Sequence, residues 1–160
     1  MMRSLLLVSL IMLAPSVAAA KETEDATLLG CSFGAPGAVA SAGSKSQKLY
    51  LLYRLDERRN ETISVIDPDA LLNGTTLRHR KTTAMSDGEL WTFAESATVP
   101  TGTMLMVLPK SVTLESGREA RPAALGQYQR SGPRNGVCVI ARGEEAITTF
   151  DELSGKDAAK

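Results

Sequence analysis

The fold is decided by the stretch LYLLYRL, residues 49–55. This stretch is apolar and aromatic and holds neither glycine nor proline, which predicts a well-buried β-strand. Residues 56–60 are charged and predict a turn, and residues 61–66 return as the second strand of a hairpin. The centre of the chain is therefore expected to form antiparallel sheet.

Similar short strands are expected on both sides of this hairpin. All 13 glycines lie after residue 20, and no segment between them holds a three-turn amphipathic helical pattern. Eight or nine strands separated by turn residues predict an all-β fold, a small antiparallel barrel or sandwich of about eight strands. The other strands are expected at residues 26–33, 75–85, 89–94, 103–108, 111–115, 124–130 and 137–142.

One short helical turn is expected between Asp67 and Gly74. Asp67 suits an N-cap, Pro68 suits the first helical position, and Gly74 can end the turn in the left-handed conformation. The alternative is a calcium loop, which needs an oxygen ligand where Leu71 stands and a glutamate near Arg78. Neither is present, so the helical turn is favoured.

The N-terminus has the features of an export signal. Arg3 supplies a positive charge, residues 5–13 are apolar, and small residues precede position 21. The apolar run is too short to span a bilayer, so the chain is expected to be periplasmic or secreted and not membrane-spanning after cleavage. The expected domains are a signal peptide at 1–20, a polar leader at 21–25, a β-domain at 26–143 and an acidic C-terminal tail at 144–160.

The chain holds two cysteines, Cys31 and Cys138. In an oxidising compartment the expected arrangement is one disulfide that closes a loop of 107 residues. No Cys-x-x-Cys spacing is present, which argues against a redox-active pair. The bond predicts that the first and last strands are neighbours, and closure of a barrel by this pair is favoured over two facing sheets.

Composition excludes several classes of function. Lys and Arg total 18 and so do Asp and Glu, and the aromatic fraction is 4%, so neither a basic surface excess nor a stacking platform for nucleic acid is expected. One histidine and two cysteines are too few for a zinc cluster. A copper(I) site would use His79 with Met85, Met104 and Met106, but methionines on strands more often fill the core, so no metal and no cofactor are expected.

His79 lies in the basic tract Leu77-Arg78-His79-Arg80-Lys81. No nucleophile motif accompanies this histidine, so an enzyme is not predicted, and a strand histidine on a solvated basic edge is favoured. Leu77 and His79 should share one strand face, and Arg78 and Arg80 the other. The tract Arg78, His79, Arg80 and Lys81 is therefore either an anion-binding edge or, as we favour, an edge strand charged against aggregation.

A possible basic face follows later in the chain. Five arginines stand there against Glu119: Arg118, Arg121, Arg130, Arg134 and Arg142. The acidic tail that follows could fold back over this surface as a short helix or ordered segment. Alternatively, the arginines could meet an anionic envelope component or an unknown partner protein.

Trp91 and Phe93 alternate on one strand and are expected to point into the core, with Tyr50 or Tyr53 nearby. The chain has only seven aromatic residues, one Trp, three Tyr and three Phe, so a solvent-exposed Trp91 would forfeit much of the core.

The early strand cysteine in Leu29-Gly30-Cys31 and the later Gly136-Val137-Cys138 resemble small uncharacterised secreted bacterial proteins with a β-barrel-like body. This resemblance implies no activity. The cysteine layout is also similar to that of periplasmic lysozyme inhibitors, but their Ser-Ala-Ser-Gly type loop is absent, so that function is not carried over.

The function expected from the sequence is an exported, non-catalytic β-domain that binds a partner protein, a small ligand or an envelope component. Two alternatives stay open. One is a hydrolase of unrecognised type that uses His79 or a carboxylate pair. The other is a barrel that carries a lipid in an open lumen.

Overall fold

The computed structural model describes residues 25–35, 46–95, 102–127 and 132–157. The expected signal peptide and Arg130 lie outside these residues. Nine strands and one helix follow one another along the described chain: β1 (Asp25–Phe33), β2 (Gln47–Leu55), β3 (Glu61–Ile66), β4 (Arg78–Met85), β5 (Gly88–Ala94), β6 (Thr103–Val107), β7 (Val112–Thr113), β8 (Glu119–Gln127), β9 (Arg134–Arg142) and α1 (Gly143–Asp157).

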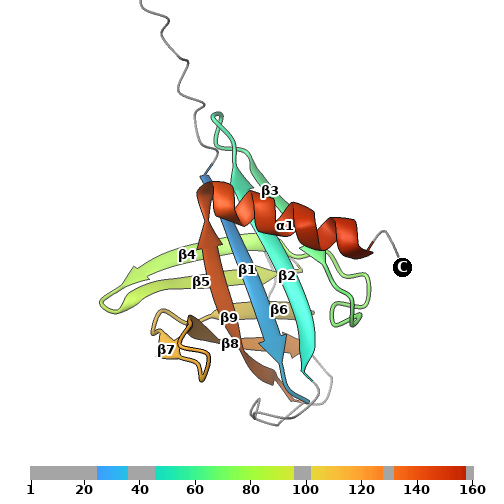
Figure 1. Cartoon of the computed structure of the whole chain (residues 1–160), viewed down its shortest axis with the longest axis vertical. Coiled ribbons are helices and arrows are strands. Elements are labelled where there is room, and N and C mark those ends of the chain that lie inside the picture. Colours follow the sequence, from blue (N-terminus) through green and yellow to red (C-terminus); the bar gives the residue numbers. More distant parts are fainter. Residues whose placement is uncertain (1–24, 36–45, 96–101, 128–131, 158–160) are drawn as a thin grey trace, which may run out of the picture.

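Eight of the strands form one antiparallel sheet in the order β3-β2-β1-β9-β8-β6-β5-β4, and the short β7 pairs with β8. The sheet twists strongly, so that β4 and β5 cross the direction of β1 and β2 and the sheet curls into a nearly closed barrel (Figure 1). The prediction of an all-β barrel of about eight strands is confirmed.

The disulfide between Cys31 and Cys138 is also confirmed. The two residues lie directly opposite each other on β1 and β9, with 4.0 Å between their Cα atoms. The first and last long strands are therefore neighbours in one sheet, as predicted, but their pairing does not seal the barrel, because β1 and β9 both lie in the interior of the sheet. The sheet's two edges are β3 and β4, which approach each other without a shared ladder.

The barrel interior is filled by side chains that alternate along the strands. Trp91 and Phe93 point inward as predicted, and the Trp91 ring lies 5.5 Å from that of Tyr53 in an edge-on arrangement. Tyr50 packs instead on the outer face of the sheet. The interior cluster also contains Leu29, Cys31, Phe33, Leu49, Leu51, Leu71, Leu72, Leu77, Leu105, Val107, Ala123, Leu125 and Cys138.

Gly136 lies where β9 passes very close to β1. A Cβ atom at this position would overlap with the backbone oxygen of Ser32 and stand 2.7 Å from Cδ1 of Phe33. Since a backbone atom cannot move aside cheaply, the glycine of the Gly-Val-Cys segment is required by packing.

We predict that Gly136→Ala lowers the free energy of unfolding by about 1–3 kcal/mol, the usual cost of overpacking a core. The matched control is Gly126→Ala on β8, where nothing lies within 4 Å of the added Cβ. Urea unfolding of both variants tests this reason, and equal stabilities would contradict it.

The C-terminal segment forms a 15-residue helix, α1, which is longer than the sequence pattern indicated. It begins at Gly143, whose φ of 62° lets the chain turn directly out of β9. Ala146, Ile147 and Phe150 pack on the outer face of the sheet over Ala26, Leu28 and Leu52 (Figure 1). The helix therefore covers an apolar surface of β1, β2 and β9. This tertiary contact stabilises a helix whose own amphipathic pattern is weak.

Within the described ranges, no helix has both the length and the apolar character to cross a membrane.

The helical turn expected between Asp67 and Gly74 is wrong. The segment makes two successive turns, because Ala70 and Asn73 adopt left-handed conformations with φ of 52° and 53°. The Asp67 carboxylate still acts as a cap and accepts the N–H groups of Leu71 and Leu72 at 2.8 and 2.7 Å.

Candidate functional site

Polar side chains gather at the seam where the barrel edges β3 and β4 meet, and one contact, between Glu61 and His79, crosses it. Glu61 Oε1 lies 2.9 Å from His79 Nδ1 and also accepts the Tyr53 hydroxyl at 2.9 Å. His79 Nε2 lies 2.8 Å from Thr82 Oγ1. We call Tyr53, Glu61, His79 and Thr82 the seam cluster, because its central contact, Glu61 to His79, joins β3 and β4 where they share no backbone ladder.

His79 therefore does not lie on a solvated basic edge, as the sequence indicated. Its side chain is 11% exposed, and its ring stands 4.8 to 5.7 Å from those of Tyr53, Trp91 and Phe93. Glu61 could not be recognised from the sequence, because a partner 18 residues away on another strand leaves no local pattern.

The seam cluster shifts two pKa values. Burial, followed by the hydrogen bond to Glu61, raises the pKa of Tyr53 to about 12. Burial by itself would raise the pKa of Glu61, but the hydrogen bonds from His79 and Tyr53 outweigh it, so this pKa lies below its ordinary value. The ionised carboxylate is therefore the form that holds the seam.

This lowered pKa predicts a loss of stability in acid. The ionised form of Glu61 stabilises the folded chain above the ordinary glutamate pKa, and this contribution disappears as the pH falls from about 5 through the lowered value. Glu61→Gln should flatten this part of the curve of unfolding free energy against pH. Thermal unfolding of the wild type and of Glu61→Gln at pH values below about 5 tests the prediction. Parallel curves of stability against pH would contradict it.

Glu61, His79 and Thr82 are connected in the order acid, imidazole, hydroxyl, which is the order of a hydrolytic triad. In the neutral imidazole, Nδ1–H would donate to Glu61 and Nε2 would accept from Thr82. Thr82 pairs with Trp91 within the β4–β5 ladder, and the cavity described below is lined by other residues.

Arg78, Arg80 and Lys81 remain exposed on the edge strand β4, while Leu77 is buried and His79 faces the interior. The register against β5 shifts between His79 and Lys81, which leaves Arg80 as the bulged residue. A bulge and exposed cations are both devices that keep an edge from pairing with another chain. The defensive interpretation of this tract stays a prediction, and both features agree with it.

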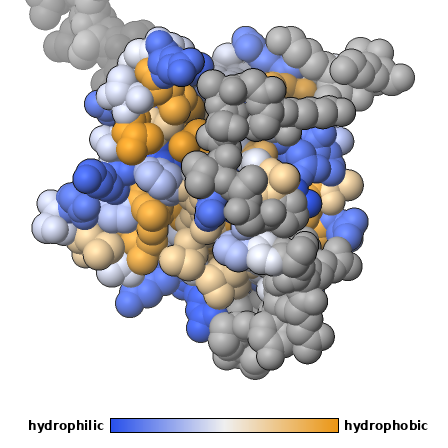
Figure 2. All heavy atoms as spheres, turned by 90° about the horizontal axis from the view of Figure 1, so that it is seen from below, coloured by the Kyte–Doolittle hydropathy of each residue, from blue (hydrophilic) through white to orange (hydrophobic). Residues whose placement is uncertain are grey.

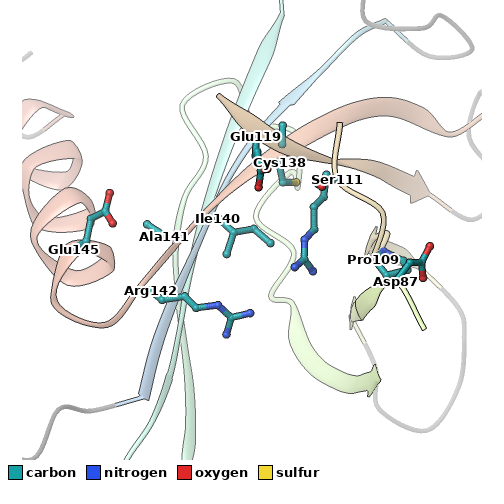
Figure 3. A pocket seen from close by; sticks show the side chains of 11 residues that line it. Asp87, Pro109, Ser111, Glu119, Cys138, Ile140, Ala141, Arg142 and Glu145 are labelled. Atoms are coloured by element: carbon teal, nitrogen blue, oxygen red, sulfur yellow. The ribbon is translucent and has the colours of Figure 1, made fainter. Parts of the chain in front are cut away.

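A cavity of about 450 Å³ opens in the barrel wall where β8 separates from β9. The ladder between these strands ends at the pair Arg121 and Cys138. Beyond Cys138, β9 pairs with β1 and no longer with β8. Glu145 of α1 and Asp87 lie on opposite sides of this wall cavity, with Ile140 and Arg142 between them (Figure 3). It is also lined by Pro109, Ser111, Glu119, Ala120 and Ala141.

Two arginines of the wall cavity meet at Glu89. Arg121 Nη1 donates to the Glu89 carbonyl at 3.1 Å, and Arg142 Nη2 donates to Glu89 Oε2 at 2.9 Å. The hydrogen bond from Arg142 lowers the pKa of Glu89 below its ordinary value, against the opposing effect of burial. The side chains of Arg142 and Glu89 are 53% and 41% exposed, so solvent and ligands can reach this ion pair.

The predicted basic face is divided by the fold. Arg121 and Arg142 line the wall cavity, and Arg118 is exposed nearby on the approach to β8. Arg134 begins β9, whereas Arg142 ends it, which separates them by about 26 Å of extended strand. Arg134 donates to the Gly34 carbonyl and to the Gln47 side chain, so it has a local structural role.

The side chains considered for copper are not brought together. Leu105 and Val107 of β6 point into the barrel, so Met104 and Met106 face outward, whereas His79 faces inward. Across the described part of the chain, no group of three or more His, Cys, Asp or Glu side chains is placed to hold a metal ion.

Hydrophobic and hydrophilic residues are interspersed on the described part of the face seen from below (Figure 2). Within the described ranges, the large apolar side chains most exposed to solvent come from separate elements: Val65, Met85, Leu108 and Val112. The wall cavity, with its convergent charged groups, is accordingly the candidate functional site.

Comparison with protein families, with curated proteins and with solved structures finds no match to this chain. Its function is inferred from the geometry of the site.

Proposed function

We propose that this protein is an exported, non-catalytic β-domain that binds an anionic group of a ligand or envelope component in the wall cavity. The observation that carries the proposal is the convergence of Arg121 and Arg142, from two different strands, on Glu89 beside a cavity of about 450 Å³. This volume lies in the range of small-ligand sites.

Export to the periplasm or beyond is part of the proposal. The buried disulfide between Cys31 and Cys138 supports it, because such bonds persist in oxidising compartments. The leader that precedes β1 has the charge and hydropathy pattern of a signal peptide.

Binding would exchange one carboxylate for another. Arg142 holds Glu89 in an exposed ion pair, which is worth little by itself. A ligand carboxylate or phosphate can take its place and accept hydrogen bonds from both guanidinium groups. The interior packing of Leu51, Phe93 and Leu105, each fully buried, favours such a wall site over a lipid in an open lumen.

Trp91 allows a direct test, because it is the only tryptophan and lies two residues from Glu89 on the same strand face. Titration with succinate and with inorganic phosphate should change its fluorescence in a saturable manner. Arg121→Gln combined with Arg142→Gln should weaken binding about tenfold or more, the cost of lost charged hydrogen bonds. The control Arg118→Gln removes one nearby charge outside the cavity, and an equal loss there would overturn the proposed site.

A hydrolase is the second candidate, because the seam cluster connects Glu61, His79 and Thr82 in triad order. The variant Thr82→Val keeps the shape of the side chain and removes its hydroxyl. We expect wild type and variant to hydrolyse p-nitrophenyl acetate at the same background rate. A wild-type rate above background that Thr82→Val lowers to background would favour the hydrolase.

A further inference from the structure

We propose that the wall cavity takes an extended peptide segment that carries a carboxylate, and that this segment pairs with the free edge of β9 at Ile140. This inference rests on the proposed function and names the class of ligand. It follows from the direction of the β9 backbone groups, the end of the β8 ladder and the charges around the cavity.

The register identifies which β9 residues face the cavity. Cα atoms 4.0 Å apart mark Cys31 and Cys138 as a non-hydrogen-bonded pair, so the N–H and C=O of Cys138 point away from β1 and toward β8. The N–H of Gly34 donates to the Asn135 carbonyl. The backbone N–H and C=O groups of the odd-numbered residues of β9 therefore point toward β1. Ile140 therefore turns its backbone N–H and C=O toward the β8 side.

The ladder between β8 and β9 does not extend to them, and the first residues of β8, Glu119 and Ala120, pair with β7 instead. The β8–β9 ladder runs from Leu125 only to Arg121, which faces Cys138. Among the described residues, the N–H and C=O of Ile140 thus face the wall cavity without a ladder partner. A strand edge of this kind is the element that binds extended peptides by strand addition.

The charges around this edge select the peptide. Arg121 and Arg142 can hold one carboxylate of a segment lying along β9. Asp87, Glu119 and Glu145 also line the cavity, so acidic side chains outnumber the two arginines there. A ligand carboxylate is therefore held only where both guanidinium groups reach it, and a polyanion would be repelled.

The probe is an amidated, N-acetylated tetrapeptide of β-branched residues ending in aspartate, without aromatic residues, so that Trp91 reports binding. Two analogues separate the interactions. In one, the backbone amides are N-methylated, which removes the strand hydrogen bonds. In the other, asparagine replaces aspartate, which removes the carboxylate. We expect both analogues to bind more weakly than the parent peptide.

Ile140→Pro is the matching change in the protein. It removes the N–H that faces the cavity and leaves the β1 ladder intact, and proline is tolerated on a strand edge of this kind. We expect peptide affinity to fall about threefold to tenfold, as for one lost hydrogen bond, and by a larger factor than succinate affinity. Ile140→Val keeps the N–H and is the control. If the proline variant does not fold, slowed hydrogen exchange at the Ile140 amide on peptide binding to wild type supplies the same test.

The outcomes separate the two proposals. Equal binding of the parent and N-methylated peptides, or unchanged exchange at Ile140, overturns strand pairing while anion binding stands. Equal binding of the asparagine analogue overturns the role of the carboxylate. If neither succinate, nor phosphate, nor the peptide binds, the proposed function itself is wrong.

Discussion

Replacement of Cys31 and Cys138 together by alanine should lower the free energy of unfolding by about 4–5 kcal/mol, the chain-entropy value for a loop of roughly 100 residues. The native bond closes a loop of 107 residues and joins two neighbouring strands in the interior of the sheet. Since a whole domain is stable by about 5–15 kcal/mol, this loss would leave a marginal fold.

Urea unfolding of the wild type and the double variant measures this loss. Reductant should also lower the unfolding temperature by many degrees. Both cysteines are almost completely buried, so reductant will act on unfolded molecules, and reduction should be carried out in denaturant before refolding. A loss below about 1 kcal/mol would mean that the hydrogen bonds between β1 and β9 hold the sheet without the disulfide.

Trp91→Ala has the second large effect, a loss of about 3–5 kcal/mol, as for other buried aromatic residues. Trp91 is 5% exposed and packs against the rings of Tyr53, His79 and Phe93 inside the barrel. Its removal opens a cavity in the interior between Tyr53 of β2 and Phe93 of β5. Thermal and urea unfolding test the prediction.

Trp91→Phe is the matched control. Among the described residues the indole N–H makes no hydrogen bond, although it lies close enough to Glu89 to help lower the pKa of that carboxyl. Phenylalanine keeps most of the ring packing and removes this buried donor, so it should cost much less than alanine. A phenylalanine variant as unstable as the alanine variant would show that the indole N–H, and not the packing, stabilises the interior.

The strands and their inward faces could be predicted because they depend on local pattern. Residues 49–55 and 61–66 form β2 and β3 as expected, and Trp91 and Phe93 face the core. A period of two along a strand records which face is buried, whatever the neighbouring strands are. Helix α1 was underestimated, because only a few apolar residues attach it to the sheet and its extent depends on that contact.

The candidate site could be predicted only in its components. Arg121 and Arg142 were named as cations, but they lie on different strands and meet only because β8 leaves β9 at this point. Arg134 belongs to the same predicted set of arginines, but it stands at the other end of β9 and donates to the Gly34 carbonyl.

The sequence by itself determined the elements: the short strands, the alternation that fills the barrel and the single pair of cysteines that form the disulfide. Only the tertiary structure decided which edges meet. The seam between β3 and β4, the pairing of Glu61 with His79 and the gap beside Ile140 all follow from how far each ladder extends and how strongly the sheet twists. Those quantities are set by contacts between residues far apart in the chain, and a local pattern carries no record of them.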